Sequence, residues 1–297
     1  MRLLRVLLLT TLVIAPQAAR ADHYASFYVI PVASRTPGAN GTQWMSDVAI
    51  QNFQTTPLEV QLVLIESGES SSENARPIVT DRINGTATVP AGGSVLLTDI
   101  LNGYRGSQSV TGSILVGADR PFAVTGRSYS STPSGDTVGQ TVQPARDFLD
   151  NTIGRTDLSM AVAYLPGLIS NARFRTNLGF VAGNATGGTM ALEITLRDAS
   201  GTMVGTSRRF AIAGNSFTHV QFSSRVIGDR PFDIGSATIR IVEGSGAVVP
   251  YASVIDNVTA DAVFVLGQFP ANSTSAKAAG ASSSVFRSVF NRVKVME

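Results

Sequence analysis

The chain has 297 residues, a low charged fraction of 15%, 28 glycines and no cysteine. The absence of cysteine excludes disulfides, thiolate metal sites and a lipobox cysteine for a lipid anchor. The formal net charge is +2, but three of the 23 basic residues lie in residues 1–21, which leaves 20 against 21 acidic residues. A chain near neutrality without a Lys/Arg stripe does not fit nucleic-acid binding.

The first 21 residues have the pattern of a secretory signal peptide. Arg2 and Arg5 form a positive region, an apolar run extends to Ala15, and Ala19-Arg20-Ala21 fits a cleavage site. An uncleaved anchor is the alternative. We expect cleavage and export to the periplasm, the cell surface or the medium. No later run approaches about 18 apolar residues, so no transmembrane segment is expected after cleavage.

The region 22–145 predicts a first all-β domain of short strands separated by turns. An opening strand at 25–32 contains Pro31, which indicates an edge strand or a strand end. The polar segment 66–76 is expected to be a solvated loop, and 99–103 a single helical turn. Further strands are expected at 44–53, 58–66, 78–83, 86–89, 94–98, 112–116, 123–129 and 137–142, with a type I′ hairpin at Asn84-Gly85.

A second domain is predicted at 158–271, after a semi-rigid linker at 146–157. Its strands are expected at 160–164, 174–182, 190–198, 204–212, 216–222, 236–242, 248–255 and 262–268. Residues 272–297 form a tail with apolar residues at helical spacing near its end. The tail is expected to dock on its own domain; the alternative is a basic amphipathic helix that contacts a membrane or a partner.

Two stretches in the two domains share one pattern. Trp44 and Phe174 each begin a strand, Asp47 and Asn177 follow three residues later, and apolar residues then alternate. Both stretches follow a Pro-Gly pair, Pro37-Gly38 in one and Pro166-Gly167 in the other. These landmarks predict a divergent duplication: two tandem immunoglobulin-like antiparallel β-sandwiches of seven to eight strands each.

The landmarks also carry a family resemblance. They are Tyr28–Ala33, Pro37–Trp44, Phe174–Val181 and Tyr251–Asn257. The region 27–271 resembles a tandem β-sandwich module common in exported proteins of environmental bacteria. The resemblance implies export and an immunoglobulin-like architecture, and it transfers no functional residue to this chain.

Catalytic motifs are weak throughout the sequence. The chain has two histidines, His23 and His219, and we expect His219 to be a surface or half-buried strand residue. No G-x-S-x-G elbow is present, and two distant histidines without cysteine do not make a zinc site. We therefore predict that the protein is not an enzyme and needs no cofactor.

Calcium binding remains an open alternative, because calcium takes carboxylate and backbone oxygens from loops. The weak candidates are Asp136, Asp256 and Asp261. Ordinary turns use the same residue types, and no EF-hand spacing exists.

Three further residues are singled out. Trp44, the only tryptophan, is a possible surface aromatic for sugar stacking, although its counterpart Phe174 favours a packing role. Asp47 and Asn177 are predicted to be a structural pair whose side-chain oxygens bind the backbone amides of neighbouring loops.

The leading functional hypothesis is a non-catalytic structural, adhesion-type or protein-interaction protein with an unknown protein or cell-envelope partner. The alternative is a carbohydrate- or calcium-dependent binding module. An enzyme of unrecognised type is the third hypothesis.

Overall fold

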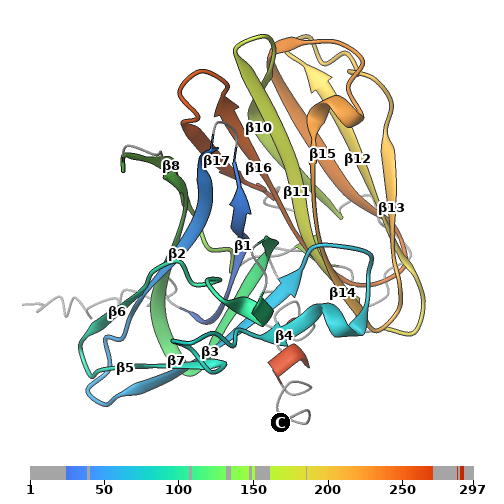
Figure 1. The fold of residues 1–297 in the computed structure, drawn as a ribbon. Coiled ribbons are helices and arrows are strands. Elements are labelled where there is room, and N and C mark those ends of the chain that lie inside the picture. The colour runs from blue at the N-terminus through green and yellow to red at the C-terminus, as the bar shows by residue number, and fades with distance from the viewer. Residues whose placement is uncertain are drawn as a thin grey trace, which may run out of the picture.

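The structure is a computed structural model. It describes residues 25–38, 41–106, 109–131, 135–146, 149–150, 161–184, 186–269, 286 and 288–290. The expectations for the signal peptide, for most of the linker and for most of the tail lie outside the described residues. The described chain is dominated by antiparallel strands, which confirms the all-β sandwich class (Figure 1). Within that part of the chain, no helix is long and apolar enough to cross a membrane.

The first half of the described chain contains eight strands and two short 3-10 turns. They are β1 (Ala25–Pro37), β2 (Gln43–Gln51), β3 (Leu58–Glu66), η2 (Ser72–Asn74), β4 (Ala75–Pro77), β5 (Thr86–Val89), β6 (Ser94–Leu97), η3 (Tyr104–Gly106), β7 (Val110–Ser131) and β8 (Thr137–Val142). The first part of β7 pairs with β1 and β3, and its second part pairs with β2 and β8. The long strand β7 therefore passes from one layer of the sandwich to the other.

The second half forms two separate sheets. Its elements are β9 (Leu149–Asp150), β10 (Val162–Ser170), β11 (Phe174–Asn184), β12 (Met190–Asp198), β13 (Arg208–Ile212), β14 (Ser216–Ser223), η4 (Ser224–Val226), β15 (Phe232–Glu243), β16 (Ala247–Asp256) and β17 (Ala262–Leu266). One sheet has the order β10-β15-β12-β13. The other, which we call the junction sheet, has the order β14-β11-β16-β17, with β9 paired to β16.

The two halves have the same pattern of strand pairing once β4, β9 and the short β1–β2 ladder are set aside. In chain order, the sixth strand pairs with the first and the third, and the seventh pairs with the second and the eighth. β7 supplies both the sixth and the seventh strand of the first half, whereas β15 and β16 are separate. The immunoglobulin fold shares the second–fifth and third–sixth pairs, and its pair of first and second strands has a counterpart in the first half, where β1 and β2 pair at Thr36 and Trp44.

The two prolines of the opening strands occupy corresponding places. At Pro31 the register between β1 and β7 shifts, and the Ser113 hydroxyl donates to the Pro31 carbonyl over 2.6 Å; near Pro31 the other side of β1 is bridged only at Val29, to Ala145, within the described chain. Pro166 likewise lies inside β10, opposite Ser236, just before a register shift. Proline is tolerated there because an edge strand at a bulge lacks one ladder bond. Pro166 thus matches Pro31, and its predicted equivalence with Pro37 is wrong.

Three apolar clusters hold the chain together. One lies inside the first half and one between the two sheets of the second half. The third joins the halves and includes Phe27, Val63 and Leu115 from the first half and Val181, Phe217 and Val249 from the second. Tyr251 of the second half is also buried in the first cluster. The two halves therefore share a continuous hydrophobic interface.

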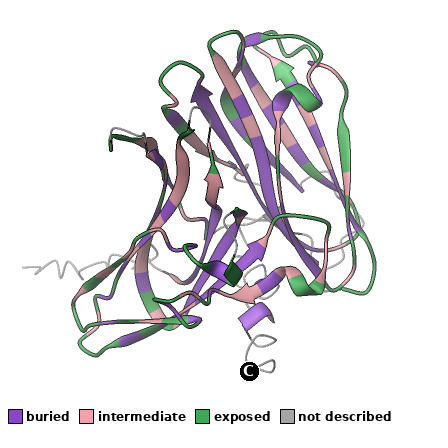
Figure 2. Cartoon of the chain, viewed as in Figure 1, coloured by how far each residue is buried: buried purple, intermediate pink, exposed green. Residues whose placement is uncertain are grey.

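The described helical residues near the C-terminus belong to this interface. Phe286, Val289 and Phe290 are all buried in the third cluster, as Figure 2 shows for this short helical segment. The rings of Phe27 and Phe290 meet edge to face, with centroids 5.8 Å apart. A Cβ atom on Gly117 would lie 2.6 Å from the Phe290 ring. The segment thus packs on the first half and not only on its own domain.

The segment predicted to be a solvated loop is an arm that binds the second half. The arm, residues 67–74, runs along β14, the edge strand of the junction sheet. Ser71 and Phe217 exchange backbone hydrogen bonds of 3.2 and 3.0 Å, and the Gly68 amide donates to the His219 carbonyl. The Thr218 hydroxyl donates to the Gly68 carbonyl over 2.6 Å. The arm covers an edge that otherwise presents unpaired backbone groups.

Three local predictions in the first half are wrong. No strand covers 78–83, where only Val79 and Asn84 form a bridge, because β4 takes up the pairing with β3 instead. Gly85 has φ +70°, but Asn84 has no positive φ, so the turn is not type I′. Asp99 has φ +43°, which places it outside a helical turn; the short η3 follows later.

Candidate functional site

The outer face of the junction sheet is divided into an apolar end and a polar end. Val181, Phe217 and Val249 point outward at the apolar end and are buried in the interface cluster. Farther along the same strands, Asn177, Gln221 and Ser253 occupy the outward positions. The first half covers the apolar end and leaves a space over the polar end. Because the outward-facing residues change from apolar to polar along these strands, a polar cleft lies beside the tightly packed interface.

This cleft has a volume of about 250 Å³ and is lined by both halves. The second half contributes Arg175, Asn177 and Gln221. The first half contributes Trp44 and Gln140, with the hydroxyl of Ser128 nearby. Aromatic, amide and hydroxyl groups therefore converge from strands far apart in the sequence. A concave site with a few convergent polar groups is the usual form of a small-ligand site.

Trp44 lies at the cleft and is partly buried. Gly38 packs against its indole, since a Cβ there would lie 3.1 Å from Trp44 Cδ1. Phe174, its counterpart in β11, packs instead against the core of the second half. The two aromatic residues thus share a strand position but have different surroundings.

Gln140 connects the halves at the floor of the cleft. Its Nε2 donates to the Ser253 hydroxyl over 2.8 Å, and the residue is 9% exposed. Its Oε1 is buried and has no hydrogen-bond partner among the described residues. A buried oxygen without a donor costs about 1–3 kcal/mol.

Arg175 supplies the charge of the cleft. Its Nη1 donates to Asn257 Oδ1 over 2.7 Å, and no described carboxylate forms an ion pair with it. Burial lowers the pKa of Arg175, because the charged guanidinium is partly removed from water. The neighbouring acid, Asp256, pairs with Arg173 at 3.0 Å instead. The cleft therefore contains a partly desolvated cation that has only a neutral amide as a partner.

Asp47 and Asn177 have equivalent strand positions and different roles. Asp47 Oδ1 accepts from the backbone amide of Asp99 over 2.8 Å and from the hydroxyl of Tyr129 over 3.1 Å. Asn177 lies on the outer face of the junction sheet. The first half covers that face, so the Asn177 side chain lines the cleft. The carboxylate of Asp47 holds a loop, while the amide of Asn177 is available to a ligand.

The calcium candidates lie in two hairpins. The Asp256 carboxylate accepts from the Val258 amide over 2.8 Å and pairs with Arg173, and these contacts, led by the Val258 bond, lower its pKa. Asp261 is exposed in the same β16–β17 hairpin, and Asp136 is exposed in the β7–β8 hairpin. Within the described ranges, no three His, Asp or Glu side chains are grouped to hold a metal.

His219 is fully buried and not half-exposed, which corrects the prediction. Its Nδ1 lies 2.5 Å from the Ser67 hydroxyl, and its Nε2 lies 2.6 Å from the Tyr251 hydroxyl. A serine beside a histidine is the geometry of an activated nucleophile. However, burial lowers the pKa of His219 to about 3, and a base so weak is poorly matched to neutral pH. The hydrogen bonds from Ser67 through His219 to Tyr251 therefore have a structural role: they connect the arm to the second half.

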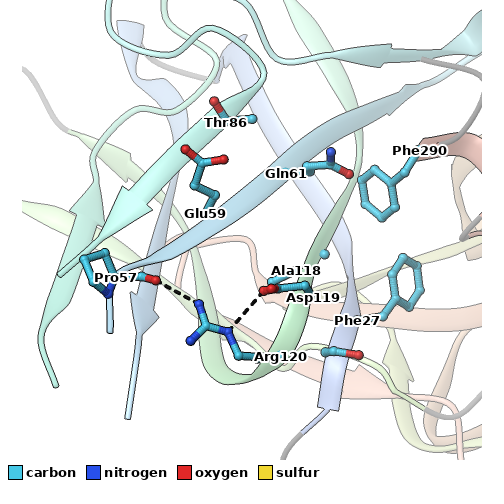
Figure 3. A pocket seen from close by; sticks show the side chains of 11 residues that line it. Phe27, Pro57, Glu59, Gln61, Thr86, Ala118, Asp119, Arg120 and Phe290 are labelled. Carbon is cyan, nitrogen blue, oxygen red and sulfur yellow. Dashed lines mark hydrogen bonds and ion pairs between the residues drawn. The ribbon is translucent and has the colours of Figure 1, made fainter. Parts of the chain in front are cut away.

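A larger hollow of about 640 Å³ lies on the first half beside the C-terminal helical segment (Figure 3). Glu59 and Gln61 line one side and Phe290 lies at one end. Its cation, Arg120, donates to the Pro57 carbonyl over 2.8 Å and pairs with Asp119 at 3.4 Å. Because its charged donor is already bound, this hollow presents a weaker case for a ligand than the cleft.

The fold and the cleft define an all-β protein with a polar site between its halves. No family model matches the sequence, and no curated protein matches it. A solved structure called BspA_C_WT aligns with 83% of this chain and 100% of its own length, at 12% identity and a TM-score of 0.20. A similarity of this size carries no inference about function.

Proposed function

We propose that this chain is a non-catalytic exported protein of adhesion type. The cleft between its halves binds a chemical group that belongs to its partner. The observation that supports this most directly is the convergence of Trp44, Arg175 and Asn177 from the two halves on one cleft. Export rests on the signal-peptide pattern of residues 1–21. We also propose that the two halves are diverged copies of one sandwich, on the basis of their common pairing pattern.

The packing around the cleft favours binding over chemistry. The arm and the shared apolar interface hold the two halves together beside the cleft, so little ordering of the halves is needed when a ligand enters. His219, the histidine in the described part of the chain, is a weak base and does not line the cleft. A rigid polar site without a tuned acid or base is suited to recognition.

The single tryptophan makes the proposal directly testable. Trp44 is the only tryptophan, so the intrinsic fluorescence of the protein reports on the cleft. We expect at least one member of a panel of cell-envelope polymers and oligosaccharides to shift or quench this emission. The Gln140→Ala variant should weaken that binder, measured by calorimetry.

A matched control is Arg127→Gln, on the opposite face of β7 from Ser128. This variant should bind normally. The proposal is wrong if no member of the panel perturbs Trp44, or if Gln140→Ala and Arg127→Gln bind a hit with equal affinity.

A further inference from the structure

We infer that the cleft binds an acidic saccharide and that Arg175 recognises its anionic group. This inference rests on the proposed function and specifies the chemistry of the ligand. Three features of the cleft support it: the sign of its charge, the kind of polar groups around that charge, and the size of the space.

The charge of the cleft is uncompensated. Arg175 is the one charged side chain among the described residues that line it, and none of those residues is acidic. One of its five N–H donors is bound to Asn257, and the guanidinium geometry allows two more to bind one carboxylate side by side. Pairing with an anion is more favourable for a partly buried cation than for an exposed one, because part of the cost of removing the cation from water has already been met.

The remaining lining fits a ligand rich in hydroxyl groups. Asn177 and Gln221 present side-chain amides, which both donate and accept hydrogen bonds, and Ser128 adds a hydroxyl group. Trp44 adds an apolar ring at the same cleft. Amides beside an aromatic ring complement the two kinds of surface of a pyranose, its hydroxyl edge and its C–H face.

The size of the cleft favours one sugar unit over a longer insert. Its volume of about 250 Å³ lies below the ~300–1,000 Å³ usual for a drug-sized ligand. We therefore expect one uronic acid residue of a polymer or an oligosaccharide to enter the cleft, with the rest of the chain outside. An inorganic anion and an acidic peptide are the competing ligands that the experiment separates.

The test compares two probes on the mature protein by Trp44 fluorescence and calorimetry. One probe is a trisaccharide of galacturonic acid, and the other is the same trisaccharide with its carboxyl groups reduced to alcohols. We expect the acidic probe to bind at least tenfold more tightly than the neutral probe. Arg175→Gln should remove most of this preference, Arg175→Lys should retain part of it, and Arg127→Gln should leave it unchanged.

Each other outcome overturns the inference in a distinguishable way. Equal binding of both probes removes the role of charge but leaves the cleft as a ligand site. Sulfate, phosphate or a poly-glutamate peptide that binds as tightly as the acidic trisaccharide removes the saccharide. Failure of both trisaccharides, while another member of the envelope panel perturbs Trp44, rejects the inference and retains the proposed function. The melting temperature of each variant shows that the loss is not unfolding.

Discussion

Lowering the pH from 7 to 5 should destabilise this protein through His219. The side chain is fully buried, and burial lowers its pKa from 6.5 to about 3. The folded pKa lies below the unfolded one, so the unfolded chain takes up a proton first as the pH falls. Stability from the neutral imidazole is therefore complete above about pH 6.5 and is lost progressively toward pH 3.

The size of the effect follows from the two pKa values. Each pH unit between them corresponds to about 1.36 kcal/mol of differential protonation. From pH 7 to pH 5 the loss is about 2 kcal/mol for this one group, a large share of the stability of an ordinary domain.

The measurement is urea unfolding of the mature protein and of His219→Gln at both pH values. The variant starts less stable, because Ser67 and Tyr251 lose their common partner. Only the pH-dependent part is compared: the parent should lose about 2 kcal/mol more than the variant. A His23→Gln variant controls for the other histidine. Equal losses in the parent and in His219→Gln would refute the reasoning, because they would show that this imidazole titrates normally in the fold.

Two further substitutions test the packing. Gly117→Val places a side chain where the Phe290 ring lies, so we expect a loss of about 1–3 kcal/mol, measured by thermal unfolding. Gly188→Val, at a glycine without positive φ where a Cβ meets nothing within 4 Å, is the control, and a loss of stability for Gly117→Val no larger than that for Gly188→Val would contradict the contact. Asp47→Ala leaves the Asp99 amide and the Tyr129 hydroxyl without their acceptor, and should cost about 1–2 kcal/mol. It should also lower the pKa of Tyr129, which burial and then Asp47 raise; an unchanged absorbance titration would reject this role.

The strands of this protein could be predicted from the alternation of apolar and polar residues wherever one face is buried and the other is exposed to solvent. β8 (Thr137–Val142) matches its predicted bounds, and so does β3 (Leu58–Glu66), although the second part of β3 is buried on both faces. The period-two pattern specifies which side chains share a face, but it does not specify what covers the other face. That limit explains why the arm was expected in solvent and His219 at the surface.

One signal for the shared interface is present in β16. All ten residues of Ala247–Asp256 are buried, and the strand reads as a nearly continuous apolar run without alternation. Such a run indicates a strand covered on both faces. Arg175 and Gln140 carry no comparable signal, because each is one of several polar residues in its strand. The cleft exists only once the two halves meet.

The shared interface has a practical consequence for anyone who divides this chain. Expressing either half alone would leave Val181, Phe217 and Val249, or their partners Phe27 and Leu115, facing water on a broad apolar surface. Fragments of this kind tend to self-associate, whereas the intact chain should melt in one cooperative step.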